Sequence, residues 1–422
     1  MLLLIINSLA YLLTFLFYQK KVCSLQVGSV VLLVYTMVSF GSIYLYSISP
    51  IWGIWDFTNL TFLPFLYLYV ILLISFRPLL IFDNQKVIGM QMPNNSIMNL
   101  ISISIIIVHL AFFIQTILSS FSIADLFSAD ILSENYEDKG EAMASKKGVI
   151  NIFGVLKNIF ADVLWIMFMY NWVKGKRIIA FGLICSIGIA AFTSLAWGAR
   201  GPLVSIIMQM PFAFIIFRPL MTNRQKKQVT LTAAILVLIV LLGFWSMTYG
   251  RFSDNVNHTI TDILIYYLSS DFLMFNNYAI DPGDCRYGDR VFPLIRMLFG
   301  LDTAEGFRER RLLFPKLRID DSQFTFFVGE FCIDFGPFLA FLIIAFFSFI
   351  LYRQFKKHKY DMGDIALGML WFHILIYGFS LFVYAEKSGN LRILYLLFFV
   401  YIFKRFTPQR KEEAHTIEFN NV

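Results

Sequence analysis

The chain has 422 residues, of which 58% are hydrophobic, 18% are aromatic and only 15% are charged. A soluble domain carries about a quarter charged residues, so this composition argues against a soluble globular protein. The formal net charge is +7, but the basic residues form short clusters between apolar stretches rather than one basic face. This pattern argues against nucleic acid as a partner and is typical of the loops of a membrane protein.

Apolar stretches of about 17 to 23 residues recur along the chain, close to the length that a helix needs to cross a bilayer. We therefore predict an all-α, polytopic membrane protein with about eleven transmembrane helices, forming one integral membrane domain over residues 1–422. No small-residue cleavage site follows the first stretch, so we expect a retained helix rather than a signal peptide. The expected helices cover residues 2–18, 28–46, 60–76, 98–119, 149–172, 178–197, 202–217, 229–247, 335–351, 365–384 and 391–403.

Clusters of lysine and arginine in short loops mark the cytoplasmic side of a membrane protein. Every such cluster here follows an odd-numbered stretch. One orientation, with the amino terminus outside and the carboxyl terminus in the cytoplasm, therefore satisfies all of them, and we expect a multi-pass protein of the bacterial cytoplasmic (inner) membrane. The clusters are Lys20 with Lys21, Arg77 with Lys86, Lys174 with Lys176 and Arg177, Arg224 with Lys226 and Lys227, Arg353 with Lys356, Lys357 and Lys359, and Lys404 with Arg405.

Two extracytoplasmic segments are expected to be long. The first, residues 121–148, is acidic and is interpreted as a solvated loop. The second, residues 249–334, joins the eighth and ninth helices and is rich in arginine. A guanidinium fork suits bidentate contact with phosphate or carboxylate, so the arginines either bind an anionic ligand or pair with the acidic residues of the same segment. For most of them we expect the ion pairs.

Arg200 lies in the short connection between the sixth and seventh expected helices, just before Pro202. Proline is common at the first position of a helix, and the amino terminus of a helix attracts anions. Arg200 and Gly201 therefore form a candidate anion site at the outer surface. The alternative interpretation is an arginine that only extends to the lipid headgroups.

A similar pattern precedes the ninth expected helix, which we predict to open at Asp334-Phe335-Gly336-Pro337. Asp334 is a candidate helix cap. Glu330 lies one turn earlier, near the apolar boundary, where a carboxylate could act as a general base. A structural ion pair is the alternative role for Glu330.

Four charged or histidine residues fall inside expected spans. Lys157 and Asp162 are five positions apart, so we expect them on different faces of one helix, unpaired with each other and facing the bundle or a wet cavity. His109 and His373 are interpreted as hydrogen-bonded residues rather than a proton relay.

Several short motifs together resemble bacterial O-antigen and capsule repeat-unit polymerases. They are the Ala199-Arg200-Gly201 turn, Arg251 just after the eighth helix, the large outer segment, and Gly329-Glu330 followed by Asp334-Phe335-Gly336. The resemblance covers about residues 149–351. It implies a membrane glycosyltransferase that transfers a growing glycan from undecaprenyl pyrophosphate to the next lipid-linked unit at the outer leaflet.

The resemblance assigns roles to six residues. Arg200, Gly201, Arg251 and Arg290 are the expected contacts to the substrate pyrophosphate, because arginines and a helix amino terminus stabilise developing negative charge. Glu330 is the expected catalytic base, with Asp334 in reserve.

The sequence contains no glycine-rich phosphate loop and no paired-carboxylate metal site, so we expect neither a cofactor nor a metal. The expected partners are the undecaprenyl-pyrophosphate-linked glycan and membrane lipid, with a flippase and a chain-length regulator as candidate protein partners and no nucleic acid. Aromatic residues of the large segment either stack on sugar rings or pack a helix of the segment on the bilayer surface: Tyr266, Tyr267, Phe272, Phe275 and Tyr278. A disulfide between Cys285 and Cys332 is also open.

Three other functions stay open. An O-antigen ligase would share this architecture, but such ligases carry a histidine late in the large outer loop, whereas His258 lies early in it. A lipid-linked oligosaccharide flippase or other transporter would show related halves, or broken helices with charges at mid-membrane. A noncatalytic scaffold would not require arginines at the outer turns.

Overall fold

The computed structural model describes residues 1–48, 57, 59–118, 149–196, 200–252, 259–304, 306–319, 323–357 and 359–408. Over these ranges the chain is helical, and none of them forms a β-strand. The expected outer loop at 121–148 lies outside the described residues.

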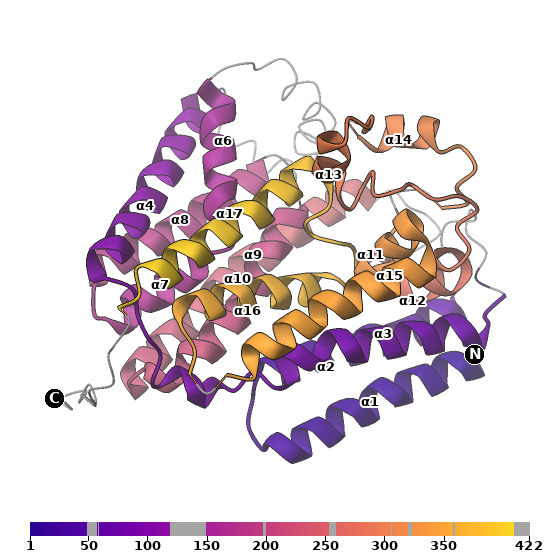
Figure 1. Cartoon of the computed structure of the whole chain (residues 1–422), viewed down its shortest axis with the longest axis horizontal. Coiled ribbons are helices and arrows are strands. Elements are labelled where there is room, and N and C mark those ends of the chain that lie inside the picture. Colours follow the sequence, from indigo (N-terminus) through magenta and orange to yellow (C-terminus); the bar gives the residue numbers. More distant parts are fainter. Residues whose placement is uncertain are drawn as a thin grey trace.

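The helices, labelled as in Figure 1, are α1 (Leu2–Val22), α2 (Val27–Ser47), α3 (Phe62–Leu80), η1 (Asn84–Val87), α4 (Asn95–Leu118), α6 (Val149–Phe160), α7 (Leu164–Val173), α8 (Arg177–Ala196), α9 (Arg200–Phe217), η3 (Arg218–Leu220), α10 (Asn223–Phe252), α11 (Ile260–Ser269), α12 (Asp271–Met274), η4 (Phe275–Ala279), α13 (Pro293–Leu298), α14 (Phe307–Leu313), α15 (Phe326–Phe355), α16 (Met362–Tyr377) and α17 (Glu386–Arg405).

Eight of the described helices are long and apolar enough to cross a membrane, or nine if α6 and α7 form one bent span. These nine correspond to the first nine stretches expected from the sequence. The expected tenth and eleventh stretches correspond to α16, which has only 16 residues, and to α17, which carries charges at both ends. The all-helical membrane fold is thus confirmed, with about eight candidate spans.

The outer surfaces of the long helices are apolar. On α15, Phe338, Leu342 and Phe346 are exposed at four-residue spacing, and α10 exposes a similar stripe that includes Leu231 and Leu238. Exposed apolar surface of this extent is unfavourable in water and marks a surface that contacts membrane. These faces therefore contact the acyl chains of lipid.

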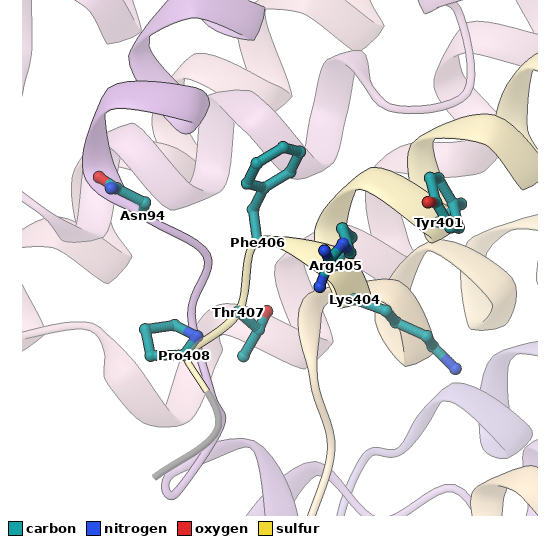
Figure 2. A pocket seen from close by; sticks show the side chains of 7 residues that line it. All are labelled: Asn94, Tyr401, Lys404, Arg405, Phe406, Thr407 and Pro408. Carbon is teal, nitrogen blue, oxygen red and sulfur yellow. The ribbon is translucent and has the colours of Figure 1, made fainter.

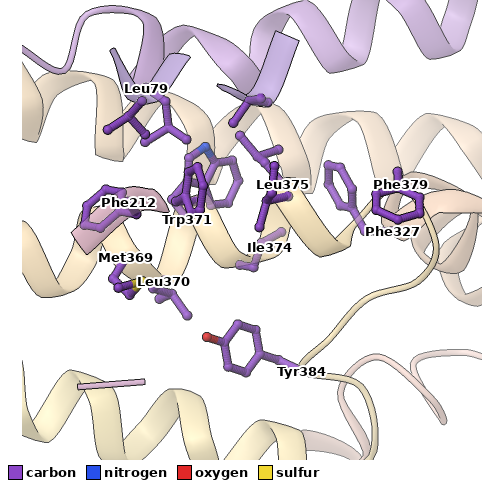
Figure 3. Packing of buried hydrophobic residues seen from close by; sticks show 14 of the residues in the cluster. Leu79, Phe212, Phe327, Met369, Leu370, Trp371, Ile374, Leu375, Phe379 and Tyr384 are labelled. Carbon is purple, nitrogen blue, oxygen red and sulfur yellow. The ribbon is translucent and has the colours of Figure 1, made fainter. Parts of the chain in front are cut away.

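The core of the bundle surrounds α16. This helix is buried along nearly its whole length, and a helix that is apolar on every side belongs inside a bundle. Figure 3 shows Trp371 of α16 packed among side chains that include Leu79 of α3 and Phe212 of α9. Trp371 Nε1 also donates to the carbonyl of Ser75 at 2.8 Å. Neighbouring helices therefore enclose α16 along its length.

Two of the long helical stretches are interrupted. The stretch at 149–172 was expected to be one helix, but α6 and α7 meet at a bend of 59°. In α15, Gly336 has φ 75° and ψ 158°, so the helix is interrupted there and resumes at Pro337. A proline after the break cannot donate a hydrogen bond to the preceding turn. The break at Gly336 separates a buried first half from a lipid-facing second half.

The loops that carry the basic clusters all lie at one end of the bundle. Near the end of α1, the Tyr18 hydroxyl donates to the carbonyl of Leu80, the last residue of α3, at 3.2 Å. In the next loop, Lys86 Nζ donates to the carbonyl of Lys357 after α15, at 2.9 Å. These contacts join three of the six clusters.

Further contacts add the other three clusters to the same end. Gln225, at the start of α10, donates to the carbonyl of Trp172 near the end of α7 at 3.1 Å, and η1 packs against η3 after α9. The amide of Asn94 donates to the carbonyl of Phe406 after α17 at 3.1 Å. All six clusters thus share one end, here called the basic end. Figure 1 shows α1 starting and α17 finishing at opposite ends of the bundle.

A shallow pocket of about 640 Å³ also lies at the basic end. Figure 2 shows its lining, which includes Asn94 before α4 and Lys404 and Arg405 at the end of α17. Lys404 pairs with Asp364 at the start of α16, at 3.3 Å. The segment from α11 to α14 lies at the other end (Figure 1), so this pocket is remote from the residues considered next.

Candidate functional site

Glu330 and Asp334 lie on the first half of α15. The sequence placed them in the loop before the ninth helix, which is wrong, because α15 begins at Phe326. A helix does begin within the predicted Asp334-Phe335-Gly336-Pro337 motif, at Pro337 after the break at Gly336, but a first helical half that was not expected precedes it. Since Glu330 and Asp334 are four residues apart in a helix, both carboxylates face the same side. Both side chains are buried, so each needs a partner.

Arg286 supplies a partner to both carboxylates. Its Nη2 donates to Glu330 Oε2 at 2.9 Å, and its Nε donates to Asp334 Oδ1 at 2.6 Å. The guanidinium therefore bridges two acids one helical turn apart, with only 1% of its side chain exposed. The amide of Arg286 also donates to the carbonyl of Ile333 at 3.1 Å. This part of the large segment is thus held against α15 by charge and backbone contacts together.

Arg290 approaches the same carboxylates from the next turn of the segment. Its Nε lies 3.2 Å from Glu330 Oε2. The backbone amides of Arg290 and Val291 donate to Asp334 Oδ2 at 3.2 and 2.8 Å. Asp334 therefore holds the segment through backbone amides as well as a side chain, whereas the Glu330 carboxylate is bound by the guanidinium groups of Arg286 and Arg290. The structural ion pair considered for Glu330 is present.

A second set of ion pairs adjoins the first. Arg310 Nε donates to Asp289 Oδ2 at 2.6 Å, and its two terminal nitrogens bind the Glu386 carboxylate at 2.9 Å each. Arg310 is 1% exposed. Glu386 opens α17, and its amide donates to the carbonyl of Arg290 at 2.8 Å. Arg310 therefore connects the large segment to the last helix, as expected for an arginine paired within a folded segment.

Together these side chains form what we call the outer charge network: Arg286, Arg290, Asp289, Arg310, Glu330, Asp334 and Glu386. With Arg296, 3.9 Å from Asp289, the network has four arginines and four carboxylates, so its formal charge balances. An anion that bound one of these guanidinium groups would compete with the carboxylates already paired with it.

The structure brings together only some of the expected site residues. Arg290, Glu330 and Asp334 are in contact, as described. Gly201 lies in the first turn of α9, and its carbonyl is 3.5 Å from the Tyr377 hydroxyl at the end of α16. Arg200 starts α9 and Arg251 lies near the end of α10, but their side chains lie outside the described part of the chain.

The aromatic residues of the large segment mostly pack the bundle. Phe272 and Phe275 are fully buried, and both contact the ring of Phe326 at the start of α15. The Tyr266 hydroxyl donates to Gln323 at 2.8 Å. Phe272 and Phe275 thus pack inside the protein, so neither expected role, stacking on sugar rings or packing on the bilayer surface, describes them. Cys285 and Cys332 are free thiols, so the disulfide left open by the sequence does not form.

A second charged group lies inside the bundle, and the sequence carries no sign that its members meet. Asp162 sits at the bend between α6 and α7 and accepts from Arg392 of α17 at 2.6 Å. His373 Nδ1 lies 3.3 Å from Asp162 Oδ1, and its Nε2 is 2.8 Å from Ser205 Oγ. Gln209 Nε2 also donates to Asp162 at 3.0 Å. Asp162 therefore faces the bundle, as expected, and His373 is hydrogen-bonded, as expected.

The sequence carries only weak signals for these ion pairs. Arg286 and Arg290 are four residues apart, as are Glu330 and Asp334, and this matched spacing could have suggested the pairing. Arg392 carries a clearer signal, because a buried arginine in an apolar stretch requires an acidic partner. No local signal identifies that partner as Asp162, which is 230 positions away.

Comparison of the chain with protein-family models, with curated proteins and with solved structures finds no match.

Proposed function

We propose that this protein polymerises oligosaccharide repeat units carried on undecaprenyl pyrophosphate, on the outer face of the bacterial cytoplasmic membrane. The proposal includes eleven spans, with α16 and α17 as the last two, and a cytoplasmic basic end. The observation that carries it is the Glu330 carboxylate held between Arg286 and Arg290, at the end of the bundle opposite the basic end. A candidate base and two phosphate-binding groups therefore occupy one place.

The chemistry follows from the exchange of partners in the outer charge network. A hydroxyl of the acceptor unit attacks the anomeric carbon of the donor glycan, and the bond between that carbon and the pyrophosphate oxygen breaks. The hydroxyl proton passes to Glu330, and guanidinium groups take the charge of the departing pyrophosphate. When Arg290 moves from Glu330 to a phosphate oxygen, the carboxylate becomes a better proton acceptor. Arg200, Gly201 and Arg251 are further proposed contacts to the pyrophosphate.

Deleting the gene tests this function directly. Assembly and export of single repeat units would continue without polymerisation, so we expect surface glycan of one repeat unit instead of long chains. The chain-length distribution on a gel measures this, and complementation with the intact gene restores the long chains. If single units also vanish from the surface, the protein acts earlier, as a flippase, or attaches all glycan, as a ligase.

A lipid-linked oligosaccharide transporter is the second candidate, and one observation favours it. The bend between α6 and α7 places Asp162, paired with Arg392 and His373, inside the bundle. Transporters form binding sites at interrupted helices with charges at mid-membrane. In that case the deletion strain would accumulate single lipid-linked units on the cytoplasmic leaflet, whereas loss of a polymerase leaves them on the outer leaflet.

A further inference from the structure

Asp271 differs from every other buried carboxylate in the described chain. Six carboxylates are buried there, and five of them pair with a basic side chain: Asp162, Asp289, Glu330, Asp334 and Asp364. Asp271 has no ion-pair partner among the described residues, and neither of its side-chain oxygens has a hydrogen-bond partner there. Its exposed fraction is 0%. An isolated buried charge costs several kcal/mol or more, so another species must neutralise it.

Two unpartnered hydroxyl groups accompany Asp271. Ser270 precedes it in the chain, and Thr325 caps the start of α15. Both side chains are 1% exposed, and neither hydroxyl has a hydrogen-bond partner among the described residues. Thr325 lies near Asp271 because the backbone amide of Phe326 faces the Asp271 carboxylate, although not within hydrogen-bonding geometry. Asp271, Ser270 and Thr325 thus supply four side-chain oxygen atoms that have no hydrogen-bond partner among the described residues.

The backbone around these groups is held in an unusual conformation. Phe326 has φ 63°, a region that residues with side chains seldom adopt. Its ring packs against Tyr35 of α2 and Phe272 of α12, with centroids 5.9 and 4.7 Å away. Such strain persists where the surroundings hold it in place, often at ligand sites. The aromatic packing therefore fixes the start of α15 beside Asp271.

We propose that Asp271, Ser270 and Thr325 form a binding site for a monovalent metal cation such as sodium. Carboxylate and hydroxyl oxygens are ligands that hard cations prefer. The charge selects a monovalent ion, because one carboxylate and one such cation cancel, whereas a divalent ion would leave a buried positive charge. Among the described residues, no group of three histidine, cysteine or acidic side chains is placed to hold a metal ion, which is consistent with this choice.

A proton is the competing ligand of the carboxylate. Burial raises the pKa of Asp271 well above its usual value, against a smaller, opposite effect of the nearby backbone amides. The other titratable groups that face Asp271 are Tyr35 of α2 and Tyr266 of α11. Neither supplies a positive charge. A cation therefore competes with a single proton, and its binding should strengthen as pH rises.

The test measures thermal unfolding of the purified full-length protein in detergent micelles at pH 8, in sodium chloride and in choline chloride of equal ionic strength. Ligand binding to the folded state raises stability with the logarithm of concentration above half-saturation. We expect the unfolding temperature to rise with the logarithm of the sodium concentration but not with choline, and no such rise in Asp271→Asn. Thr325→Val and Ser270→Ala should require more sodium for the same shift. Asp302→Asn, an exposed carboxylate, is the matched control and should behave as wild type.

The outcomes separate the cation from the proton. A sodium-specific shift that Asp271→Asn abolishes supports the site. Equal unfolding temperatures of the wild-type protein in sodium and choline overturn it and leave Asp271 as a buried neutral acid. A sodium shift that survives in Asp271→Asn also overturns it. These unfolding temperatures do not depend on glycan polymerisation, so they test the cation site independently of the proposed function.

Discussion

At the scale of single residues, Glu330 and Asp334 have different surroundings although they share a helix face. Asp334 accepts from Arg286 and from two backbone amides, so its carboxylate organises the chain around it. Glu330 is bound by the guanidinium groups of Arg286 and Arg290, which can move to another anion without unfolding the backbone. The two acids therefore separate a structural role from a proposed catalytic role.

This difference predicts different effects of two conservative substitutions. Glu330→Gln keeps the shape and can still accept from a guanidinium, so we expect a normal amount of protein but chain growth slower by about 10²- to 10⁴-fold, the usual contribution of a general base. In Asp334→Asn, an NH2 group replaces one of the two carboxylate oxygens that accept from Arg286 and from the backbone amides of Arg290 and Val291. Donor would then face donor, so we expect mainly a lower unfolding temperature. The measurements are surface chain length and thermal unfolding. Normal chain growth with Glu330→Gln would show that Glu330 is only a structural partner.

Arginines were the hardest residues to interpret from sequence. Their number in the large segment left an anionic ligand open, although ion pairs were expected for most of them, and the contacts show that several of them hold the segment to the bundle. Arg310 is the clearest example, because Asp289 and Glu386 both bind it and these acids lie in different parts of the chain. Which arginine pairs with which acid depends on the docking of segments far apart in sequence, so composition alone could not assign the pairs.

At the scale of elements, the long apolar helices were predictable and the breaks were not. Each of the first nine apolar stretches has a corresponding helix, because length and composition decide whether a segment can span a bilayer. The bend between α6 and α7 arises around Asp162, whose partner Arg392 lies in the last helix. A kink stabilised by such a distant contact leaves no periodic signal in the local sequence.

The break in α15 gives a prediction for that element. Gly336 adopts φ 75° and ψ 158°, a conformation that essentially only glycine reaches without strain of about 1 to 3 kcal/mol. No atom would meet a Cβ at Gly336, so only the backbone opposes a larger residue. Gly336→Ala should lower the unfolding temperature and displace Glu330 and Asp334 from Arg286, which would reduce chain growth.

Gly188 provides the matched control for that substitution. It lies within the regular helix α8, and a Cβ there would also meet open space. Gly188→Ala should leave stability unchanged or raise it, because alanine favours a helix by about 1 kcal/mol over glycine. If both variants unfold like the wild-type protein, the interruption in α15 does not depend on glycine, and Pro337 alone accounts for it.

At the scale of the whole molecule, the sequence predicted which loops lie together at one end better than it predicted the number of membrane-spanning helices. Six basic clusters were expected on one side, and contacts between those loops place them at one end of the bundle. The number of crossings depends on whether the short α16 and the charged α17 count as spans. Hydropathy reports only how apolar a segment is. It cannot distinguish a helix that faces lipid from one such as α16, which is surrounded by protein.

The basic end is predicted to face the cytoplasm, and single cysteines can test this orientation. Cys23 is exposed at the end of α1, beside Lys20 and Lys21, whereas Asp302 is exposed in the large segment at the opposite end. In a variant that retains Cys23 alone, a membrane-impermeant maleimide should react only after the cells are permeabilised. In a second variant, with Asp302→Cys as the sole thiol, it should react in intact cells. Labelling of Cys23 in intact cells would reverse the orientation and place the outer charge network in the cytoplasm, where the proposed polymerisation could not occur.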